Sequence, residues 1–435
     1  MTRERIDGLQ IVLLGGVLVF IVGAIIARAN PQGMSDFKQF YYASRCLIEH
    51  HDPYQESQIW AVYTAEVENV PSDPATLKWL HEILLCPNMP TTFLFMAPLA
   101  LLPWNAAVTV WMALIVASFF VAGYLVWRVC ADIAPRYSAV LVSLVFVTSG
   151  VGLSIGNTAA LVVGLCIIAV YCFVTERFVR VGVLCLAVSL AIKPHDAGIV
   201  WLYFLLAGGV ARRRALESLA VTALIALPAV LWISHVVPHW PQELSANLHA
   251  ITSQGGQDDP GPHSSGAFGV VMTANLQVIF SRIKDDPGFY NPMVYLLCGV
   301  PLALWAVKTL RLRYSPAHAW YALAAAVPFA MLVVYHRFYD CRLLLVAVPA
   351  CVDLWWSRSP VRWYALAVTL AGIIVTGDLL WIVVFQFTKY SGRSLGAAII
   401  PAPIVILVMG VFYLWVYLKR SSGQGSFLDT AVDAA

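Results

Sequence analysis

Long apolar segments, separated by short polar connections, fill most of this chain of 435 residues. The first segment covers about residues 9–27, and an α-helix of about 20 apolar residues is long enough to cross the hydrocarbon core of a bilayer. The remaining segments predict spanning helices at about 105–127, 137–151, 157–175, 181–193, 197–210, 215–234, 292–308, 318–335, 341–356, 363–386 and 397–418. The pattern therefore predicts an all-α, polytopic integral membrane protein with about 12 transmembrane helices.

Two long polar connections interrupt this pattern. The first, 28–104, is rich in acidic residues and contains an apolar run, 91–103, that is too short to span and predicts a helix lying at the membrane interface. The second, 235–291, contains at 251–266 a stretch rich in Gly, Ser, Gln, Asp and Pro, which predicts a mobile loop tip with a lid as one role. We expect one transmembrane domain over 1–420 and a disordered cytoplasmic tail over 421–435.

Lysine and arginine residues in the short connections predict the orientation, because cytoplasmic loops carry an excess of both. With twelve spans and an interfacial 91–103, both termini and all the short basic connections fall on the cytoplasmic side, including Arg128/Arg136, Arg177/Arg180, Arg212–Arg214, Lys308/Arg311/Arg313 and Arg358/Arg362. The more polar connections then lie outside: 28–104, 154–157, 193–196, 235–291, 336–342 and 387–396. We therefore expect a multi-pass protein of the cell membrane that acts on its extracytoplasmic face.

Composition agrees with this class. Hydrophobic residues make up 60% of the chain and charged residues 12%, about half the charged share of a soluble domain. No block of Lys or Arg forms a nucleic-acid patch, so nucleic acid is not an expected partner. The nine cysteines contain no CxxC pair, and Cys46 and Cys86, which share the first outer loop, are either free or disulfide-bonded.

Asp36 is the first candidate for chemistry. It follows the first span after the break at 30–33, next to the aromatic residues Phe40, Tyr41 and Tyr42. A carboxylate at this depth fits the catalytic base of a membrane-embedded sugar transferase. The alternative is structural: Asp36 caps a helix that begins at Phe37.

Two further polar groups are expected at span ends on the same face. They contain Lys193, His195 and Asp196 in one group, and His336, Arg337, Asp340 and Arg342 in the other. Together they offer the cations that hold a leaving phosphate. The alternatives are a plain helix end for the first group and interfacial snorkelling for the second. No carboxylate spacing requires a metal, so we expect no cofactor, although the acidic first loop could ligate a divalent ion.

Short motifs in this order resemble those of polytopic GT-C-class glycosyltransferases of family 87, which includes polyprenyl-phosphate-mannose-dependent mannosyltransferases. They are Asp36 with 40–42, Asp52-Pro53-Tyr54, 86–90, Pro98-Leu99 through Pro103 with Trp111, Gly156-Asn157, Lys193-Pro194, 275–277 with Arg282, and 336–340. The chain departs from the family in two motifs. Family members often have Gly-Gln where this chain has Gly156-Asn157, and they often have two prolines where this chain has Pro87-Asn88-Met89-Pro90.

The resemblance implies a GT-C-like fold and an inverting transfer of mannose, or another hexose or pentose, from a polyprenyl-phosphate donor to a lipid or glycan hydroxyl. Asp36 would be the base, and Lys193, His336, Arg337 and Arg342 would bind the donor phosphate. We assign substrate contacts to Tyr41, Tyr42, Asn157, His195, Gln277 and Asp340. A lipid-linked-glycan flippase or secondary transporter is the alternative from another class. A ligase that joins preassembled glycans would share the chemistry and differ in its donor.

Overall fold

In the computed structural model the secondary-structure elements of the described residues are α-helices and a 3-10 helix. The structure describes residues 2–29, 33–67, 70–264, 273–391, 402–420 and 426–429. In chain order the helices are α1 (Arg3–Ala29), α2 (Ser35–Ile48), α3 (Glu56–Glu66), α4 (Pro74–Leu84), α5 (Pro90–Ala100), α6 (Trp104–Cys130), α7 (Pro135–Val147), α8 (Gly150–Ile155), α9 (Ala159–Val174), α10 (Val179–Ile192), α11 (Pro194–Ala207), α12 (Gly209–Val236), α13 (Trp240–Thr252), α14 (Gln277–Phe280), α15 (Pro287–Arg311), α16 (Pro316–Val333), the 3-10 helix η1 (Asp340–Val346), α17 (Ala347–Trp356), α18 (Arg362–Val375), α19 (Asp378–Ser391) and α20 (Ala402–Lys419).

Six of the described helices, α1, α6, α12, α15, α16 and α20, are long and apolar enough to cross a membrane. Five shorter apolar helices accompany them: α5, α7, α9, α10 and α18. This confirms the all-α prediction and fits a multi-pass membrane protein, while the number of twelve spans stays a prediction. The long helices differ in how deeply they are buried. In α16, 83% of the apolar stretch is buried within the protein, against 11% of the apolar stretch of α12. α16 is therefore a central helix, and α12 turns most of its apolar surface outward.

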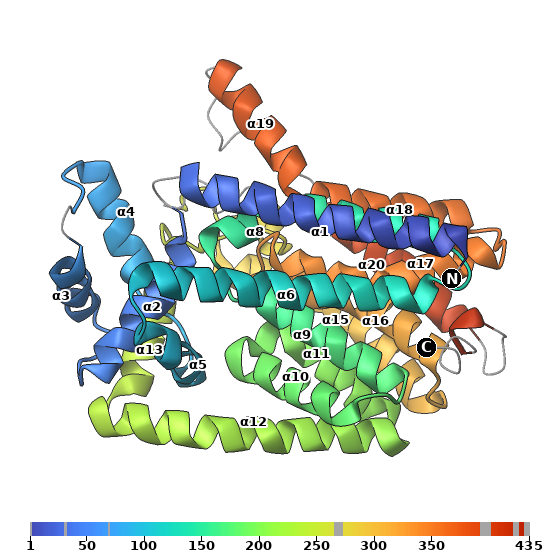
Figure 1. Cartoon of the computed structure of the whole chain (residues 1–435), viewed down its shortest axis with the longest axis horizontal. Helices are drawn as coiled ribbons and strands as arrows, with labels where there is room; N and C mark the ends of the chain where they lie inside the picture. Colours follow the sequence, from blue (N-terminus) through green and yellow to red (C-terminus); the bar gives the residue numbers. More distant parts are fainter. Residues whose placement is uncertain are drawn as a thin grey trace.

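Three predicted spans are divided rather than continuous. Segment 363–386 forms α18 and α19, with a break at Thr376 and Gly377. The break has a physical cause, because Asp378 N–H donates to Thr148 O (3.0 Å) and the Asp378 carboxylate accepts from Val151 N–H (2.7 Å). Segment 137–151 likewise ends as α7 at Val147 before α8, and segment 341–356 begins as η1. After its break α19 projects from the bundle (Figure 1).

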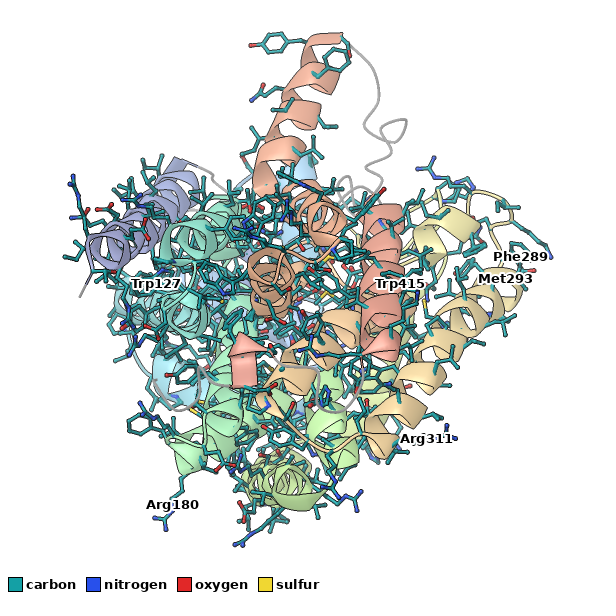
Figure 2. All side chains as sticks on the ribbon, turned by 90° about the vertical axis from the view of Figure 1, so that its right-hand side faces the viewer. Trp127, Arg180, Phe289, Met293, Arg311 and Trp415 are labelled. Carbon is teal, nitrogen blue, oxygen red and sulfur yellow. The ribbon has the colours of Figure 1, made fainter. Side chains whose placement is uncertain are left out.

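Both chain ends lie at one end of the bundle, and the helices of the long connections, α2–α5 and α13, gather at the opposite end (Figure 1). Asn247 of α13 joins the two long connections by donating to Tyr54 O (2.8 Å) and Cys86 O (3.0 Å). Figure 2 looks at the end that carries the termini, where Arg180 and Arg311 point outward from the rim of the bundle. This arrangement agrees with the expected separation of basic connections from long polar loops.

Two smaller expectations concern the cysteines and the C-terminal tail. All nine cysteines are free and buried, so Cys46 and Cys86 form no disulfide. The Cys46 thiol donates to Asp52 O instead. The tail 421–435 lies mostly outside the described residues. Within its described part Leu428 is buried and Asp429 accepts a hydrogen bond from Ala317 N–H at 3.1 Å.

Candidate active site

A cavity of about 340 Å³ lies beneath the helices of the long connections. Its walls come from α2, the stretch before α5, the α8–α9 junction, the α10–α11 junction, the loop after α13, and the turn between α16 and η1. Its volume falls in the range of about 300–1,000 Å³ typical of small-ligand pockets. Six of the residues proposed from sequence line it: Asp36, Asn157, Lys193, His195, Arg337 and Asp340.

Asp36 occupies the first turn of α2, on one wall of this cavity. The helix begins at Ser35 after Met34, which has a left-handed backbone (φ 59°). The alternative in which Asp36 caps a helix starting at Phe37 is therefore wrong. The Asp36 carboxylate accepts one hydrogen bond from the Ser35 hydroxyl at 3.1 Å and another from Asn157 Nδ2 at 2.5 Å.

The Gly156–Asn157 motif brings this second donor to Asp36. Gly156 has φ 70°, and a Cβ there would lie 2.8 Å from both Met34 Cε and Phe37 Cβ, so only glycine lets α2 approach this closely. Asn157 Oδ1 accepts from Ala159 N–H at 2.7 Å, which fixes the amide so that its NH₂ group faces Asp36. The motif thus orients the carboxylate.

The surroundings of Asp36 shift its proton affinity. Burial raises the pKa of its carboxyl above the ordinary value, while the Asn157 hydrogen bond and the positive charges of Arg337 and Lys193 lower it by smaller amounts. A carboxylate that keeps a raised pKa and accepts hydrogen bonds from neutral donors is suited to taking up a proton.

A second part of the cavity wall, formed by the α10–α11 junction and the turn before η1, contains a row of paired charges. Lys193 stands between α10 and α11, where Pro194 starts the new helix, and its ammonium group lies 3.3 Å from Asp196 and also donates to Asp340. Asp340 in turn accepts from Arg337 N–H at 2.7 Å, which fixes the turn before η1. Burial lowers the pKa of Lys193, but the two carboxylates outweigh it, so the pKa is raised and the ammonium stays charged.

His336 and Asp196 lie behind this wall, buried and outside the cavity lining. His336 Nε2 is 3.1 Å from Asp196 Oδ1, and its Nδ1 contacts Val334 O at 3.0 Å. Burial lowers the pKa of His336, but the Asp196 carboxylate outweighs it, and the net shift is upward. His195 faces the cavity, and burial lowers its pKa to about 3, so its imidazole is neutral at physiological pH.

His195, Asp196 and His336 are also the candidate metal ligands in the described part of the chain. One ligand atom from each lies within 4.8 Å of the others. The ammonium of Lys193 lies 3.3 Å from the Asp196 carboxylate, and the His336 ring faces its other oxygen. The positive charge of Lys193 already compensates the carboxylate and opposes a divalent ion. The expectation that no metal is needed stays a prediction.

Arg337 points into the cavity and holds an acidic residue that sequence reasoning did not single out. Its Nη2 donates to Asp258 Oδ1 at 2.8 Å, and the Tyr335 hydroxyl donates to the same oxygen at 2.6 Å. Asp258 lies in the polar stretch 251–266, for which the sequence predicts a mobile loop tip with a lid as one role. Gln39, one turn after Asp36 on α2, and Tyr339 also line the cavity; helical spacing gave a signal for Gln39.

Besides His336, four residues proposed from sequence lie outside the cavity lining. Tyr41 donates to Leu102 O at 2.8 Å, Tyr42 stacks on Trp104 with ring centroids 5.8 Å apart, and Gln277 donates to Val333 O at 2.7 Å. All three therefore position backbone and helices around the cavity in this structure. Their role as substrate contacts stays a prediction.

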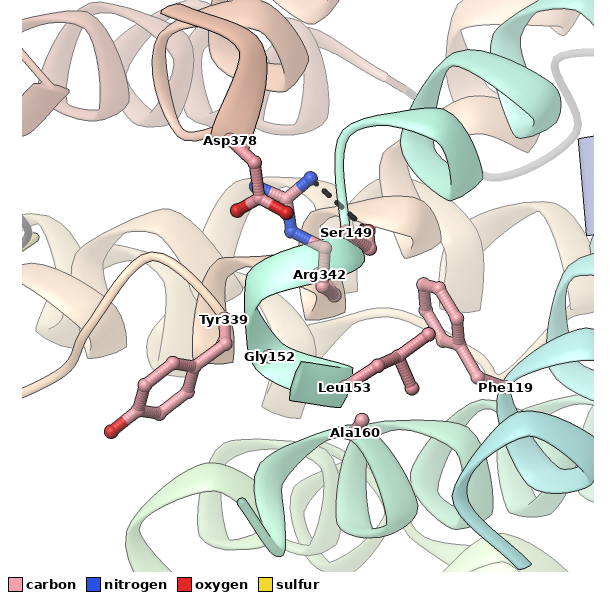
Figure 3. A pocket seen from close by; sticks show the side chains of 8 residues that line it. All are labelled: Phe119, Ser149, Gly152, Leu153, Ala160, Tyr339, Arg342 and Asp378. Atoms are coloured by element: carbon pink, nitrogen blue, oxygen red, sulfur yellow. Dashed lines mark hydrogen bonds between the residues drawn. The ribbon is translucent and has the colours of Figure 1, made fainter. Parts of the chain in front are cut away.

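Arg342 is the fourth, and it points away from the cavity. Its guanidinium donates to Thr148 Oγ1 and Thr376 Oγ1, each at 2.9 Å, and lies beside Asp378 (Figure 3). Tyr339 also lines this small site, and its ring points away from Arg342 and Phe119 (Figure 3). Arg342 thus joins the α7–α8 junction to the break between α18 and α19.

Comparison with known proteins adds the family. The sequence profile of Glycosyltransferase family 87 matches residues 88–335, more than half of the chain. The matched region includes Asn157, Lys193, His195 and Asp258, and it ends directly before His336. No curated protein and no solved structure matches the chain. The chain therefore belongs to glycosyltransferase family 87 and is a membrane glycosyltransferase.

Proposed function

We propose that the protein transfers a sugar from a polyprenyl-phosphate donor to a hydroxyl of a lipid or glycan acceptor on the extracytoplasmic face of the cell membrane. Family membership supports a transferase over the flippase or transporter alternative. The donor class and the outer-face location rest on the sequence resemblance and on the gathering of polar loops at one end of the bundle.

One observation carries the assignment of the base. Three carboxylates line the cavity: Asp36, Asp258 and Asp340. Asp340 is paired with Lys193 and Asp258 with Arg337, so a proton on either carboxyl would cost an ion pair. Among the described residues Asp36 forms no ion pair, and its hydrogen-bond partners are neutral. Asp36 is the carboxylate that can gain a proton at the lowest cost.

The wall that carries Lys193 and Arg337 supplies positive charge for the phosphate. Arg337 offers a guanidinium fork that matches a phosphate, and Lys193 offers a point charge; both line the cavity. His336 acts indirectly: it pairs with Asp196, and Asp196 in turn contacts Lys193. Arg342 is left out of this set because it points into a separate site.

The reaction is a single displacement. Asp36 accepts the proton of the acceptor hydroxyl while the hydroxyl oxygen attacks the anomeric carbon. The bond from that carbon to the phosphate oxygen breaks, and polyprenyl phosphate leaves with both electrons of that bond. Attack from the face opposite the leaving group inverts the anomeric configuration. The developing second phosphate charge is stabilised by Arg337 and Lys193.

The test measures release of polyprenyl phosphate from polyprenyl-phosphate mannose by the purified protein, with membrane-lipid extract as acceptor. Asp36→Asn keeps the shape of residue 36 and an oxygen that accepts from Asn157, and it removes the base, so we expect at least a 100-fold loss, in line with the roughly 10²–10⁴-fold contribution of acid–base catalysis. Glu49→Gln at the C-terminal end of the same helix is the matched control and should retain activity. Substantial activity in Asp36→Asn would place the base elsewhere.

Other donors separate the sugar from the mechanism. Release from a different lipid-linked hexose or pentose, but not from the mannose donor, would keep Asp36 as base and change the sugar. Transport of a lipid-linked sugar across liposomes without release would contradict the proposal.

A further inference from the structure

The cation proposed to bind the donor phosphate already binds an anion of this chain. Arg337 Nη2 and the Tyr335 hydroxyl both donate to Asp258 Oδ1, at 2.8 and 2.6 Å. Arg337 Nε also bonds to the Tyr335 hydroxyl, and the guanidinium lies 5.6 Å from the centre of the Tyr335 ring. The two side chains therefore form a cradle for one anionic oxygen, and Asp258 fills it.

The two sides of this contact are anchored differently. Arg337 and Tyr335 lie in the turn after α16, which Asp340 fixes through Arg337 N–H and which Ala274 N–H joins by a hydrogen bond to His336 O (2.8 Å). Asp258 lies in the loop after α13. That loop bonds mainly to itself, since Asp259 accepts from Gly255 N–H and Gly261 N–H.

In the described part of this loop, residues 253–264, the hydrogen bonds to other elements besides those of Asp258 come from polar groups near its two ends. Ser281 Oγ donates to Pro260 O at 2.8 Å, and Gln254 donates to Asp285 at 3.2 Å. The side chain of Asp258 lines the cavity and is only 16% exposed. If an anion entered the cradle, the loop could release Asp258 without breaking the helical framework.

We propose that Asp258 is an internal competitor for the donor phosphate: it occupies the phosphate position on Arg337 and Tyr335 in the empty enzyme, is displaced when the donor binds, and returns as polyprenyl phosphate leaves. This rests on the proposed function. A carboxylate and a phosphodiester each carry one negative charge, so the exchange leaves the charge on the Arg337 cradle unchanged. The competition weakens the binding of donor and product alike and favours product release, which limits the rate of many enzymes.

Asp258→Asn tests this by removing the competing charge at nearly constant shape. We expect polyprenyl phosphate to bind about tenfold more tightly, which corresponds to about 1.4 kcal/mol. KM for the donor should fall, and kcat should fall with it as product release slows. Asp258→Glu keeps the carboxylate and should restore the affinity of the parent protein.

The matched control is Asp285→Asn. Asp285 contacts Gln254 of the same loop and has no bond to Arg337, so this variant perturbs the loop without freeing the cradle. Its affinity for polyprenyl phosphate should match that of the parent protein. Damage to the fold would weaken binding, so a gain in affinity confined to Asp258→Asn cannot come from misfolding.

The outcomes also separate this inference from the proposed function. If the parent protein turns over a polyprenyl-phosphate sugar and Asp258→Asn binds polyprenyl phosphate equally or more weakly, Asp258 orients Arg337 and the competitor proposal is wrong. If the parent protein neither binds polyprenyl phosphate nor releases it from any donor, the donor class is wrong and the competitor proposal fails with it.

Discussion

The two walls of the cavity differ in whether their charged groups have neutral or charged partners. On one wall Asp36 accepts hydrogen bonds from neutral groups, the Ser35 hydroxyl and the Asn157 amide. On the other wall Lys193 lies between Asp196 and Asp340. The proposed base has to change its protonation in each turnover, so neutral partners suit it. The proposed phosphate site has to keep its charge, and carboxylates on both sides of Lys193 hold the ammonium protonated.

This difference shows how one small cavity can hold both functions. Lys193 lies between the carboxylates of Asp196 and Asp340, and His336, whose pKa is raised, pairs with Asp196, so the charges behind the phosphate site are paired among themselves. Asp36 therefore does not have to act as the counter-ion of Lys193. Its pKa stays raised by burial, which a direct ion pair would reverse.

The largest expected effect comes from removing the central cation. Lys193→Met leaves Asp196 and Asp340 facing each other without Lys193, and breaking a buried ion pair costs about 3–5 kcal/mol of unfolding free energy. Activity should be lost together with thermal stability, as measured by the unfolding temperature of the purified protein and by donor turnover.

Two further variants control this prediction. Lys38→Met removes a cation on the Asp36 side that lies 6.0 Å from the centre of the Trp79 ring and outside the cavity lining, and it should leave both quantities almost unchanged. Adding Asp340→Asn to Lys193→Met should restore part of the lost stability. If the double variant is no more stable than the single one, the two charges are not coupled as described.

The next effect concerns the Asp36 wall. The Asn157 hydrogen bond lowers the pKa of Asp36, so Asn157→Ala should raise that pKa further. A base works only when deprotonated, and the rise of kcat/KM with pH should therefore move to higher pH. We expect about a tenfold loss on the acid side and recovery at alkaline pH, in a pH profile of kcat/KM. An equal loss at every pH would favour the role predicted from sequence, in which Asn157 contacts substrate.

A smaller effect tests the charge held behind the second wall. The pKa of His336 is raised in the folded protein, so its protonated form contributes stability that is fully present below the unfolded value of about 6.5 and is lost as pH rises through the folded value. The parent protein should therefore lose thermal stability as pH rises above about 6.5, through the raised pKa of His336.

Two substitutions locate this loss. His336→Gln should remove it and give a flatter profile of unfolding temperature against pH. His195→Gln should keep it, because burial lowers the pKa of His195 to about 3 and the imidazole is neutral throughout this range. A loss that persists in His336→Gln would assign it to another group.

Sequence patterns predicted the helical class and the segments that meet at the cavity, because apolar run length and charged residues at span ends are local properties. They assigned Asp36, Lys193 and Arg337 to one region, and the structure brings these side chains together. The contact of Asp258 with Arg337 was missed, because it joins residues 79 positions apart and depends on how a loop folds back. The sequence pattern also does not predict in which direction a side chain points within a short turn.

Arg342 illustrates that last limit and gives the smallest expected effect on catalysis. It follows Arg337 by only five residues, but η1 turns its guanidinium toward Thr148 and Thr376. Arg342→Lys would lose the fork that bonds both threonines, and it should lower the unfolding temperature by a few degrees, since each hydrogen bond to a charged group is worth about 1.5–3 kcal/mol at most.

In Arg342→Lys, KM for the donor should stay within about twofold of the parent value, whereas Arg337→Lys should raise it about tenfold or more through loss of two-point phosphate binding. If Arg342→Lys raises KM as much as Arg337→Lys, the phosphate site extends past Tyr339 into the site of Figure 3, and the wall of paired charges would not be its boundary.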